Sequence, residues 1–440
     1  MAAVLLLQDS GSDTPSTAAS AVATTTITAT TATSTSTSAA TEPTTTSSTS
    51  TTTTTFPLIE LPDTPIVVWV DELRGAAIRQ AAATFRTHYD TPITVEIVDY
   101  YSVKAELLAQ SDHKTGPDLF YGDHSWMNEL VAAGLITPID VRGRESEFIP
   151  TALDAVRVGE NQYGLPVSAE AVALAYNTDL VPVPPATMSD LVDSCTALPI
   201  DKECLLVRGG GDRGDAYSQQ PFLAAYGGHI FGYSPETGYD GSDVRVASPE
   251  TIRGAQLLED LVRSGHIPST NYSQARELFV GGDAAFWITG PWEINILENP
   301  GGNTNDVNWS VAALPTVDGG VLRPHVNVQG FFLHRDSGNP LAAEEFLHRF
   351  VFTPGTLIDI HFADHRGSTM ATVLDSVSGN PIAAAFTASV MNGLPQPTIR
   401  EMQSTWGPIA DALLAIRNGT LPAEVAMWEA HRQIVASLGG

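Results

Sequence analysis

Hydrophobic and polar residues alternate with two different periods from residue 65 onward. Short β-branched apolar runs indicate buried strands, and the stretches between them place apolar side chains along one helical stripe. The predicted elements are, in order, strand 66–70, helix 76–85, strand 93–98, helix 104–110, strand 117–121 and helix 126–133, which Gly134 ends. A strand–helix–strand series of this kind predicts an α/β fold with parallel-type sheets flanked by helices on both faces.

The first 63 residues lack this patterning. Residues 10–55 are mostly Thr, Ser and Ala, with almost no large apolar side chain, so burial cannot offset the entropy lost on ordering. We therefore expect a disordered, Thr/Ser/Ala-rich tether over residues 1–63. The apolar run 4–7 is shorter than the core of a signal peptide, and no cysteine follows it to accept a lipid. No later stretch reaches the ~18 to 20 continuous apolar residues of a spanning helix, so we expect any membrane attachment to run through the N-terminus.

Length and charge narrow the class of protein. The chain has 440 residues, which is too long for one hydrophobic core and predicts two folded domains besides the tether. Its formal net charge is −28, from 22 basic and 50 acidic residues, and no cluster of Lys and Arg reverses that charge locally. A nucleic-acid backbone would be repelled, so we expect no nucleic-acid partner.

The chain contains two cysteines, Cys195 and Cys204. Their spacing is not that of a C-x-x-C redox motif, and no histidine or second cysteine pair completes a zinc site. If the chain is exported, a disulfide that closes a small loop is the favoured interpretation, with free buried thiols as the alternative.

Polar and aromatic side chains follow the first and third predicted strands. Asp71 and Arg74 come after the first strand, and Asp123 and Trp126 come after the third. In open α/β sheets, ligands bind at the carboxyl ends of the strands, which makes these residues candidates for binding. An aspartate before a helix also serves as an N-cap, so capping and binding both remain open for Asp123.

A single carboxylate interrupts the apolar stretch from Leu165 to Asn177. Glu170 lies there between small apolar residues, and residues 172–176 after it have a strand pattern. A buried, unpaired glutamate would cost several kcal/mol, so its side chain must reach a charged partner, a solvated cleft or a ligand. An edge strand that faces bulk water is the competing interpretation.

Several segments together carry a resemblance to a known family. They are residues 116–118 (Gly-Pro-Asp), 132–136 (Ala-Ala-Gly-Leu-Ile), 165–177, 225–228 (Ala-Tyr-Gly-Gly), 282–292 and 402–413. In this order and at these separations, the stretch from about residue 66 to the C-terminus resembles the family 1 extracellular solute-binding proteins of ABC importers, and among them the maltose/maltodextrin-binding branch. The resemblance implies a two-lobed periplasmic-binding-protein fold of type II. Its N-lobe would hold residues 64–168 and 316–363 and its C-lobe residues 169–313 and 371–440, with hinges near 168–171, 313–316 and 365–370.

The same resemblance implies a function and a binding site. The function is that of the extracellular substrate-binding component of an ABC sugar importer, a monomer without catalytic residues, metal or cofactor. Its partners would be a carbohydrate ligand and the permease subunits, at the extracellular face of the cytoplasmic membrane or in the periplasm. A sugar ring has an apolar face and a rim of hydroxyl groups, which aromatic rings and carboxylates recognise together. The positions that match the family's pattern, and that we expect to contact the ligand, are Asp71, Arg74, Asp123, Trp126, Glu170, Tyr217, Trp292 and Trp406.

Other functions stay open at this point. The many carboxylates are compatible with an extracellular glycosidase, although no spacing identifies an acid–nucleophile pair. Gln219 and Gln220 replace aromatic residues typical of maltodextrin binders, which leaves open a shorter sugar or another solute such as a polyol, glycerol phosphate or a polyamine. A sensor domain of a receptor kinase would share the fold and differ in its partner. His361 and His365 have the spacing of metal ligands on a helix, but the glutamate of a zincin motif is missing, so we expect no metal site.

Overall fold

The computed structural model describes residues 59–109, 116–210, 214–234, 238–298 and 307–439. Up to residue 58, the predicted tether therefore lies outside the described residues. Its last part differs from the expectation, because Leu61 packs against a hydrophobic cluster and the Pro62 carbonyl accepts hydrogen bonds from Thr91 and Asn339 at 2.8 and 3.0 Å. The packed part of the chain thus includes residues 61 and 62.

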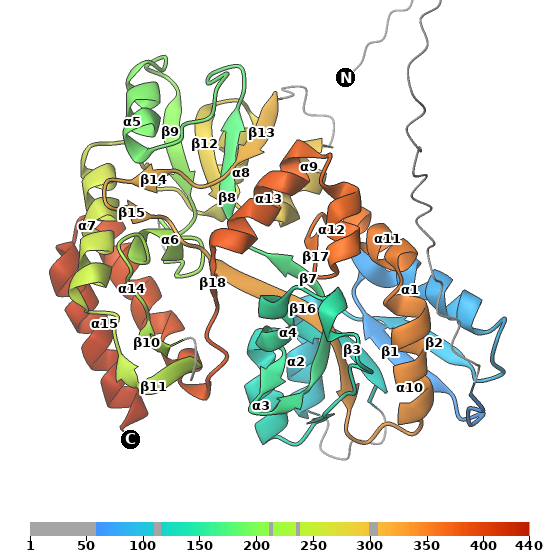
Figure 1. Ribbon diagram of the computed structural model, residues 1–440. Coiled ribbons are helices and arrows are strands. Elements are labelled where there is room, and N and C mark those ends of the chain that lie inside the picture. Colours follow the sequence, from blue (N-terminus) through green and yellow to red (C-terminus); the bar gives the residue numbers. More distant parts are fainter. Residues whose placement is uncertain (1–58, 110–115, 211–213, 235–237, 299–306, 440) are drawn as a thin grey trace, which may run out of the picture. The chain divides into compact units, whose positions relative to one another are not determined.

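Two larger sheets organise the described residues (Figure 1). The strands of the first sheet are β1 (Ile66–Val70), β2 (Ile93–Ile97), β3 (Leu119–Asp123), β4 (Ile136–Thr137), β7 (Gly164–Glu170), β16 (His325–His334), β17 (Gly367–Ser368) and β18 (Leu394–Pro395). The helical segments of the same parts of the chain are α1 (Glu72–Phe85), α2 (Tyr100–Ala109), η1 (His124–Trp126), α3 (Met127–Ala132), η2 (Glu145–Glu147), α4 (Pro150–Ala155), α10 (Pro340–Phe346), η4 (Leu347–Val351), α11 (Pro354–Asp364) and α12 (Ala371–Val377). A short hairpin joins β5 (Arg157–Val158) and β6 (Asn161–Gln162).

The first sheet runs in the order β17-β7-β16-β3-β1-β2, and β4 and β18 pair with β16. β1 pairs in parallel with β2 and with β3, as the strand–helix–strand series predicted. β16 differs, because it comes from a distant part of the chain and lies antiparallel between β3 and β7. β7 is consequently parallel to β3, so the carboxyl ends of β1, β3 and β7 and the amino end of β16 meet at one edge of the sheet.

Both faces of the first sheet are buried. Val68 and Val70 of β1 pack into one hydrophobic cluster, to which α1, α10 and α11 contribute, while Trp69 between them packs into another, to which α2, α3 and α4 contribute. Alternation of this kind is the two-residue period of a strand. The prediction of a sheet with helices on both faces is confirmed.

The second sheet runs in the order β13-β8-β12-β9. Its strands are β8 (Ala173–Asn177), β9 (Glu203–Val207), β12 (Ala284–Thr289) and β13 (Trp309–Ala312). The remaining elements are α5 (Met188–Thr196), α6 (Gln220–Leu223), β10 (Phe231–Ser234), β11 (Gly238–Val244), α7 (Pro249–Arg263), α8 (Tyr272–Val280), η3 (Pro291–Glu293), α9 (Ile294–Glu298), β14 (Thr316–Val317), β15 (Gly320–Val321), α13 (Pro381–Asn392), η5 (Arg400–Ser404), α14 (Trp406–Arg417) and α15 (Ala423–Leu438). Helices α7, α14 and α15 lie side by side and bury a shared hydrophobic cluster (Figure 1).

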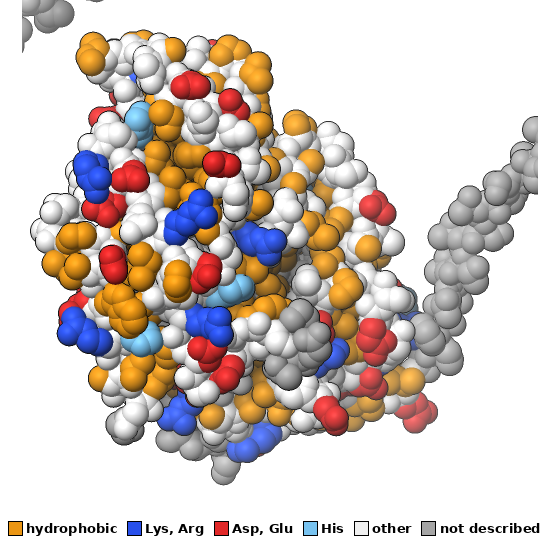
Figure 2. Space-filling view, turned by 60° about the vertical axis from the view of Figure 1, so that its left-hand side comes forward, with side chains coloured by type: hydrophobic (Ala, Val, Ile, Leu, Met, Phe, Trp, Pro, Cys, Tyr) orange, Lys and Arg blue, Asp and Glu red, His pale blue; other side chains and the backbone are white. Residues whose placement is uncertain are grey.

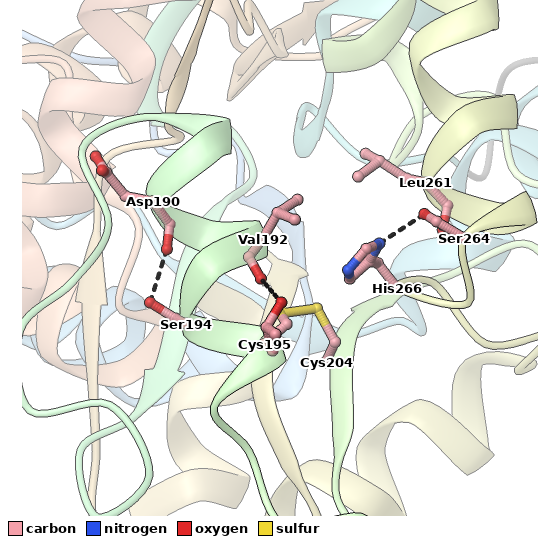
Figure 3. The surroundings of a disulfide bond; sticks show 9 residues. Asp190, Val192, Ser194, Cys195, Cys204, Leu261, Ser264 and His266 are labelled. Carbon is pink, nitrogen blue, oxygen red and sulfur yellow. Dashed lines mark hydrogen bonds between the residues drawn. A yellow bond between two sulfur atoms is a disulfide. The ribbon is translucent and has the colours of Figure 1, made fainter.

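Cys195 and Cys204 form a disulfide, which was the favoured interpretation of the sequence (Figure 3). Cys195 lies near the end of α5, and Cys204 lies on β9, an edge strand of the second sheet. The bond therefore ties this helix to the sheet. His266, in the segment after α7, lies near Cys204 in the same view, and its carbonyl accepts the Leu205 N–H at 3.0 Å. Leu261 of α7 belongs to the same hydrophobic cluster as Cys204.

Within the described residues, no helix combines the length and the apolar character needed to cross a bilayer. On the face drawn in Figure 2, acidic and basic side chains are interspersed with apolar ones. Opposite charges are thus mixed on this face, although the chain carries a net charge of −28.

Candidate functional site

Several buried polar side chains lie at the edge where the carboxyl ends of β1, β3 and β7 meet. Asp71 directly follows β1, Asp123 ends β3 and Glu170 ends β7. All three are buried, and so is Arg74 in the first turn of α1. Gln329 of β16 bridges Arg74 and Glu170 by its amide group. The structure therefore brings together four residues that the sequence predicted as ligand contacts, and we call this group, with its partners on β16, the polar edge.

Asp71 holds the first turn of α1. Its carboxylate accepts the backbone N–H of Arg74 at 3.3 Å, as an N-cap does, and pairs with the Arg74 guanidinium at 2.7 Å. The guanidinium also pairs with Asp364 and lies 4.4 Å from the centroid of the Tyr121 ring. Burial opposes the charge on Arg74, but Tyr121, Asp364 and Asp71 outweigh it and raise the pKa of Arg74. Arg74 is thus a permanent buried cation.

Asp123 combines capping with a place in the polar edge. One carboxylate oxygen accepts the backbone N–H of Ser125 at 2.8 Å, and the other accepts the Tyr100 hydroxyl at 2.9 Å and the Asn327 amide. Burial disfavours the charged form, but His124, Asn327 and the Ser125 N–H together lower the pKa of Asp123 to about 2. The carboxylate is therefore ionised at neutral pH, and the capping interpretation is confirmed for it.

Glu170 is 6% exposed and has internal partners on both carboxylate oxygens. Arg366 donates to one oxygen at 2.5 Å, and Gln329 and Asn327 donate to the other at 3.0 and 3.4 Å. Burial opposes the charge on Arg366, but the adjacent Glu170, with Asp364, raises the pKa of Arg366. The argument that a glutamate in this apolar stretch must reach a partner is confirmed, and the interpretation of an edge strand in bulk water is wrong.

Aromatic side chains gather around the amino end of β16. The ring centroids of Tyr217 and Trp292 are 6.1 Å apart. The ring centroid of His325, the first residue of β16, lies 6.5 Å from that of Tyr217 and 6.2 Å from that of Trp406. The Tyr217 hydroxyl donates to the His325 carbonyl at 3.5 Å. Three more of the predicted contact residues therefore lie near one another, in segments that pack around the second sheet.

The rings of Tyr217, Trp292 and Trp406, which we call the aromatic group, adjoin the polar edge. Burial raises the pKa of Tyr217 well above its usual value, and the charges of Glu170 and Asp123 add to that rise. A cavity of about 540 Å³ also opens beside Tyr217 and Trp406, and Asp215 lines it. This volume lies within the range of roughly 300–1,000 Å³ that is typical of small-molecule sites.

Trp126 has a different environment from the other predicted tryptophans. It is half-buried, it packs against the hydrophobic cluster of α2 and α3, and its ring centroid lies 5.2 Å from that of Tyr100. Since the Tyr100 hydroxyl donates to Asp123, Trp126 lies one residue away from the polar edge.

The sequence reasoning missed several polar residues of this group: Tyr100, Asn327, Gln329, Asp364 and Arg366. A signal for two of them was present, because the segment His-Val-Asn-Val-Gln at residues 325–329 alternates polar and apolar residues in a strand that is buried throughout. Arg366 lies within the predicted hinge 365–370, but no local pattern there marked it as an ion-pair partner.

Among the residues that the structure describes, no group of three or more His, Cys, Asp or Glu side chains could hold a metal ion. His361 Nδ1 lies 2.7 Å from the Arg366 carbonyl oxygen, and His365 Nε2 lies 2.9 Å from the Asn295 amide oxygen. These contacts occupy one nitrogen of each ring and give both histidines a structural explanation.

Residues 69–356 match the family described as bacterial extracellular solute-binding protein, which is more than half of the chain. The chain belongs to this family. The solute-binding protein is 24% identical over 388 residues to the galactooligosaccharide-binding protein of Bacillus subtilis, across 83% of this chain and 87% of that one. It is 26% identical over 319 residues to the maltotriose-binding protein of Pyrococcus abyssi, across 68% of this chain and 65% of that one.

The fold of the solute-binding protein is also found among solved structures. A cyclo/maltodextrin-binding protein complexed with maltotetraose matches it with a TM-score of 0.78 and 26% identity, covering 86% of this chain and 98% of that one. All three similar proteins are named as binding proteins.

Proposed function

We propose that this solute-binding protein is the substrate-binding component of an ABC sugar importer and binds a maltose/maltodextrin-like or related oligosaccharide. The observation that carries the proposal is the adjacency of the charged polar edge on the first sheet and the rings of Tyr217, Trp292 and Trp406. Carboxylates, amides and guanidinium groups exchange hydrogen bonds with hydroxyl groups, and the flat rings suit the C–H face of a pyranose. The names of the relatives support the same class of ligand.

The proposed mechanism is closure of two lobes on the sugar. The N-lobe holds residues 64–168 and 316–363 and the C-lobe residues 169–313 and 371–440, with the hinges near 168–171, 313–316 and 365–370. We move α12 to the N-lobe, because Val373 packs into the cluster of α1 and α11. We also move β14 and β15 to the C-lobe, because Val317 and Leu322 pack into the cluster of the second sheet. A sugar that contacts both lobes only in the closed form shifts the population toward that form, which the permease then recognises.

The proposal places the protein outside the cytoplasmic membrane, as a monomer tethered at most through its N-terminus. The family itself is described as extracellular. The disulfide between Cys195 and Cys204 supports this location, because disulfides persist in oxidising compartments.

Isothermal titration calorimetry tests the ligand class. The panel is maltose, maltotriose, maltotetraose, trehalose, cellobiose, glycerol phosphate and spermidine. We expect saturable binding of at least one maltooligosaccharide, with a rise in melting temperature that grows with sugar concentration. Binding of glycerol phosphate or spermidine without binding of any sugar would overturn the proposal and favour a binding protein for another solute.

An extracellular glycosidase is the alternative from a different class. Such an enzyme needs a carboxyl group whose pKa is raised, so that it can protonate the leaving group. The pKa of Asp123 is instead lowered to about 2, and both oxygens of Glu170 accept hydrogen bonds from internal partners. Chromatography of maltotetraose after incubation with the protein decides the matter, since new reducing ends would support the enzyme and unchanged sugar supports the receptor.

A further inference from the structure

Strand β16 presents a stripe of polar side chains at the proposed ligand site. His325, Asn327 and Gln329 occupy alternating positions and therefore share one face of the strand. Val326 and Val328, between them, pack into the hydrophobic cluster on the other face. We call the three polar residues the β16 stripe. It begins beside the rings of the aromatic group and ends in the polar edge.

Internal hydrogen bonding decreases along the β16 stripe toward the rings. Gln329 donates to Glu170, and its oxygen accepts from Tyr121 at 3.1 Å. Asn327 uses its N–H groups within the polar edge, but its Oδ1 has no partner in the described part of the chain. His325 is 3% exposed, and neither of its ring nitrogens has a partner at hydrogen-bond distance and angle there, although the nearby Leu394 backbone favours its protonated form.

A buried polar atom without a partner is expensive. The cost is about 1–3 kcal/mol for each such group, so proteins rarely keep one without a reason. Among the histidines that the structure describes, only His325 has both ring nitrogens buried and unpartnered. His124 and His348, by contrast, each place one nitrogen within 3.1 Å or less of a carbonyl oxygen.

We propose that His325 is a specificity-determining residue of the sugar site, and that its imidazole and the unpartnered Asn327 Oδ1 hydrogen-bond neighbouring hydroxyl groups of a saccharide that stacks on Tyr217 or Trp406. A neutral imidazole offers one donor and one acceptor, and the amide oxygen adds a further acceptor. Adjacent sugar hydroxyls, each both donor and acceptor, can satisfy all of these atoms. The inference rests on the proposed function and adds to it the residues that read the hydroxyl pattern.

The charge state of His325 agrees with this role. Burial, with His124 and His229 nearby, lowers the pKa of His325 to about 3, so the ring is neutral at physiological pH. A neutral ring keeps one nitrogen as an acceptor, which a protonated ring could not do.

The test compares the wild-type protein with His325→Phe by titration with maltotetraose. Phenylalanine keeps a flat ring but offers no polar atom. We expect maltotetraose to bind His325→Phe roughly 10- to 100-fold more weakly, because one or two hydrogen bonds to the sugar are lost. The melting temperature of the empty variant should be equal or higher, because the variant buries no unpartnered nitrogen.

A second pair of variants keeps the test valid if the phenylalanine disturbs packing. His325→Gln and His325→Met have similar volumes, and only glutamine can donate and accept hydrogen bonds. We expect His325→Gln to bind maltotetraose at least about 5-fold more tightly than His325→Met. Equal affinities for this pair, or an unchanged affinity for His325→Phe, would overturn the inference and leave the proposed function standing.

His348→Phe serves as the matched control. His348 is also buried, in η4, and its Nε2 lies 2.7 Å from the carbonyl oxygen of Asp140, which belongs neither to the polar edge nor to the β16 stripe. This variant should lose thermal stability and keep its affinity for maltotetraose. If the wild-type protein binds neither maltotetraose nor any other sugar of the panel, the proposed function and this inference fail together.

Discussion

At the scale of single residues, the polar edge is held by a chain of buried ion pairs. Asp364 is shared between Arg74 and Arg366, and Arg366 in turn pairs with Glu170. Because a buried charge without a partner is costly, these groups stabilise one another's charged forms. Glu170 is therefore already engaged, and a ligand would meet a prearranged surface. The aromatic rings take no part in these ion pairs. They therefore offer the clearest single-residue test of ligand binding.

Trp406→Ala is expected to weaken the binding of a maltooligosaccharide at least roughly 10-fold, because the variant loses a stacking face for the sugar. Trp406 is half-buried at the first position of α14, so the melting temperature of the empty protein should change little. Calorimetry and thermal melts measure the two quantities. The control is Trp428→Ala, because Trp428 lies on α15 and is 47% exposed. This variant should change neither the affinity for the sugar nor the melting temperature. A large fall in the melting temperature for Trp406→Ala would mark Trp406 as a core residue.

At the scale of elements, β16 positions both the ion pairs and the polar stripe. It inserts between β3 and β7, and its register against β7 shifts between Gln329 and Gly330. The two backbones approach closely there, since a Cβ at Gly330 would lie 2.3 Å from the Leu165 carbonyl oxygen. The absence of a side chain at residue 330 is therefore a condition for the arrangement of the site.

Gly330→Ala is expected to lower the free energy of unfolding by about 1–3 kcal/mol, because the added methyl group forces β16 and β7 apart. Urea denaturation measures this change. The control is Gly355→Ala in α11, where a Cβ would have open space. In a helix this substitution should leave stability unchanged or raise it by up to about 1 kcal/mol. Equal stabilities of the two variants would contradict the proposed steric conflict.

Local sequence patterns were sufficient to predict those elements that pair with a segment nearby in the chain. Strand 66–70 has the same bounds as β1, and Gly134, with φ 68°, follows α3 as predicted. The third strand was predicted at 117–121 but lies at Leu119–Asp123, because Asp123 pairs with Gln329 of β16. No local pattern could indicate that partner, which lies in a distant segment.

The same limit applies to the candidate site. Asp71, Asp123 and Glu170 could be singled out because they end strands or interrupt apolar runs. Asp364 and Arg366 could not, because their importance depends on β17 and the end of α11 lying beside β7 and α1. Parallel pairing was expected from the strand–helix–strand series, and nothing in it indicated an antiparallel strand at the centre.

At the scale of the whole molecule, buried histidines make the stability of the fold depend on pH. The pKa of His325 is lowered to about 3, by burial and then by other histidines, and that of His348 to about 4, by burial and then by Arg142. In the unfolded chain both would titrate near 6.5. The unfolded state therefore binds more protons than the folded state between these values.

Above about pH 6.5, we expect these two histidines to leave the free energy of unfolding unchanged. As the pH decreases from 6.5 toward 4, each of them should lower it by up to about 1.4 kcal/mol per pH unit. Asp123, whose pKa is lowered from 3.8 to about 2, adds a loss below pH 4. Urea denaturation at pH 8, 6.5, 5.5 and 4.5 measures the slope. His348→Phe should reduce it, and an unchanged slope in that variant would contradict the assignment.

The ion-pair chain, together with Asp71 and Asp123, also sets the electrostatic sign of the polar edge. Asp71, Asp123, Glu170 and Asp364 contribute four negative charges, against the two positive charges of Arg74 and Arg366. The excess disfavours phosphorylated or carboxylated solutes, since both arginines of the polar edge in the described part of the chain are already paired with carboxylates. An uncharged saccharide incurs no such repulsion. The protein would then discriminate between neutral and anionic solutes before the proposed closure of its lobes.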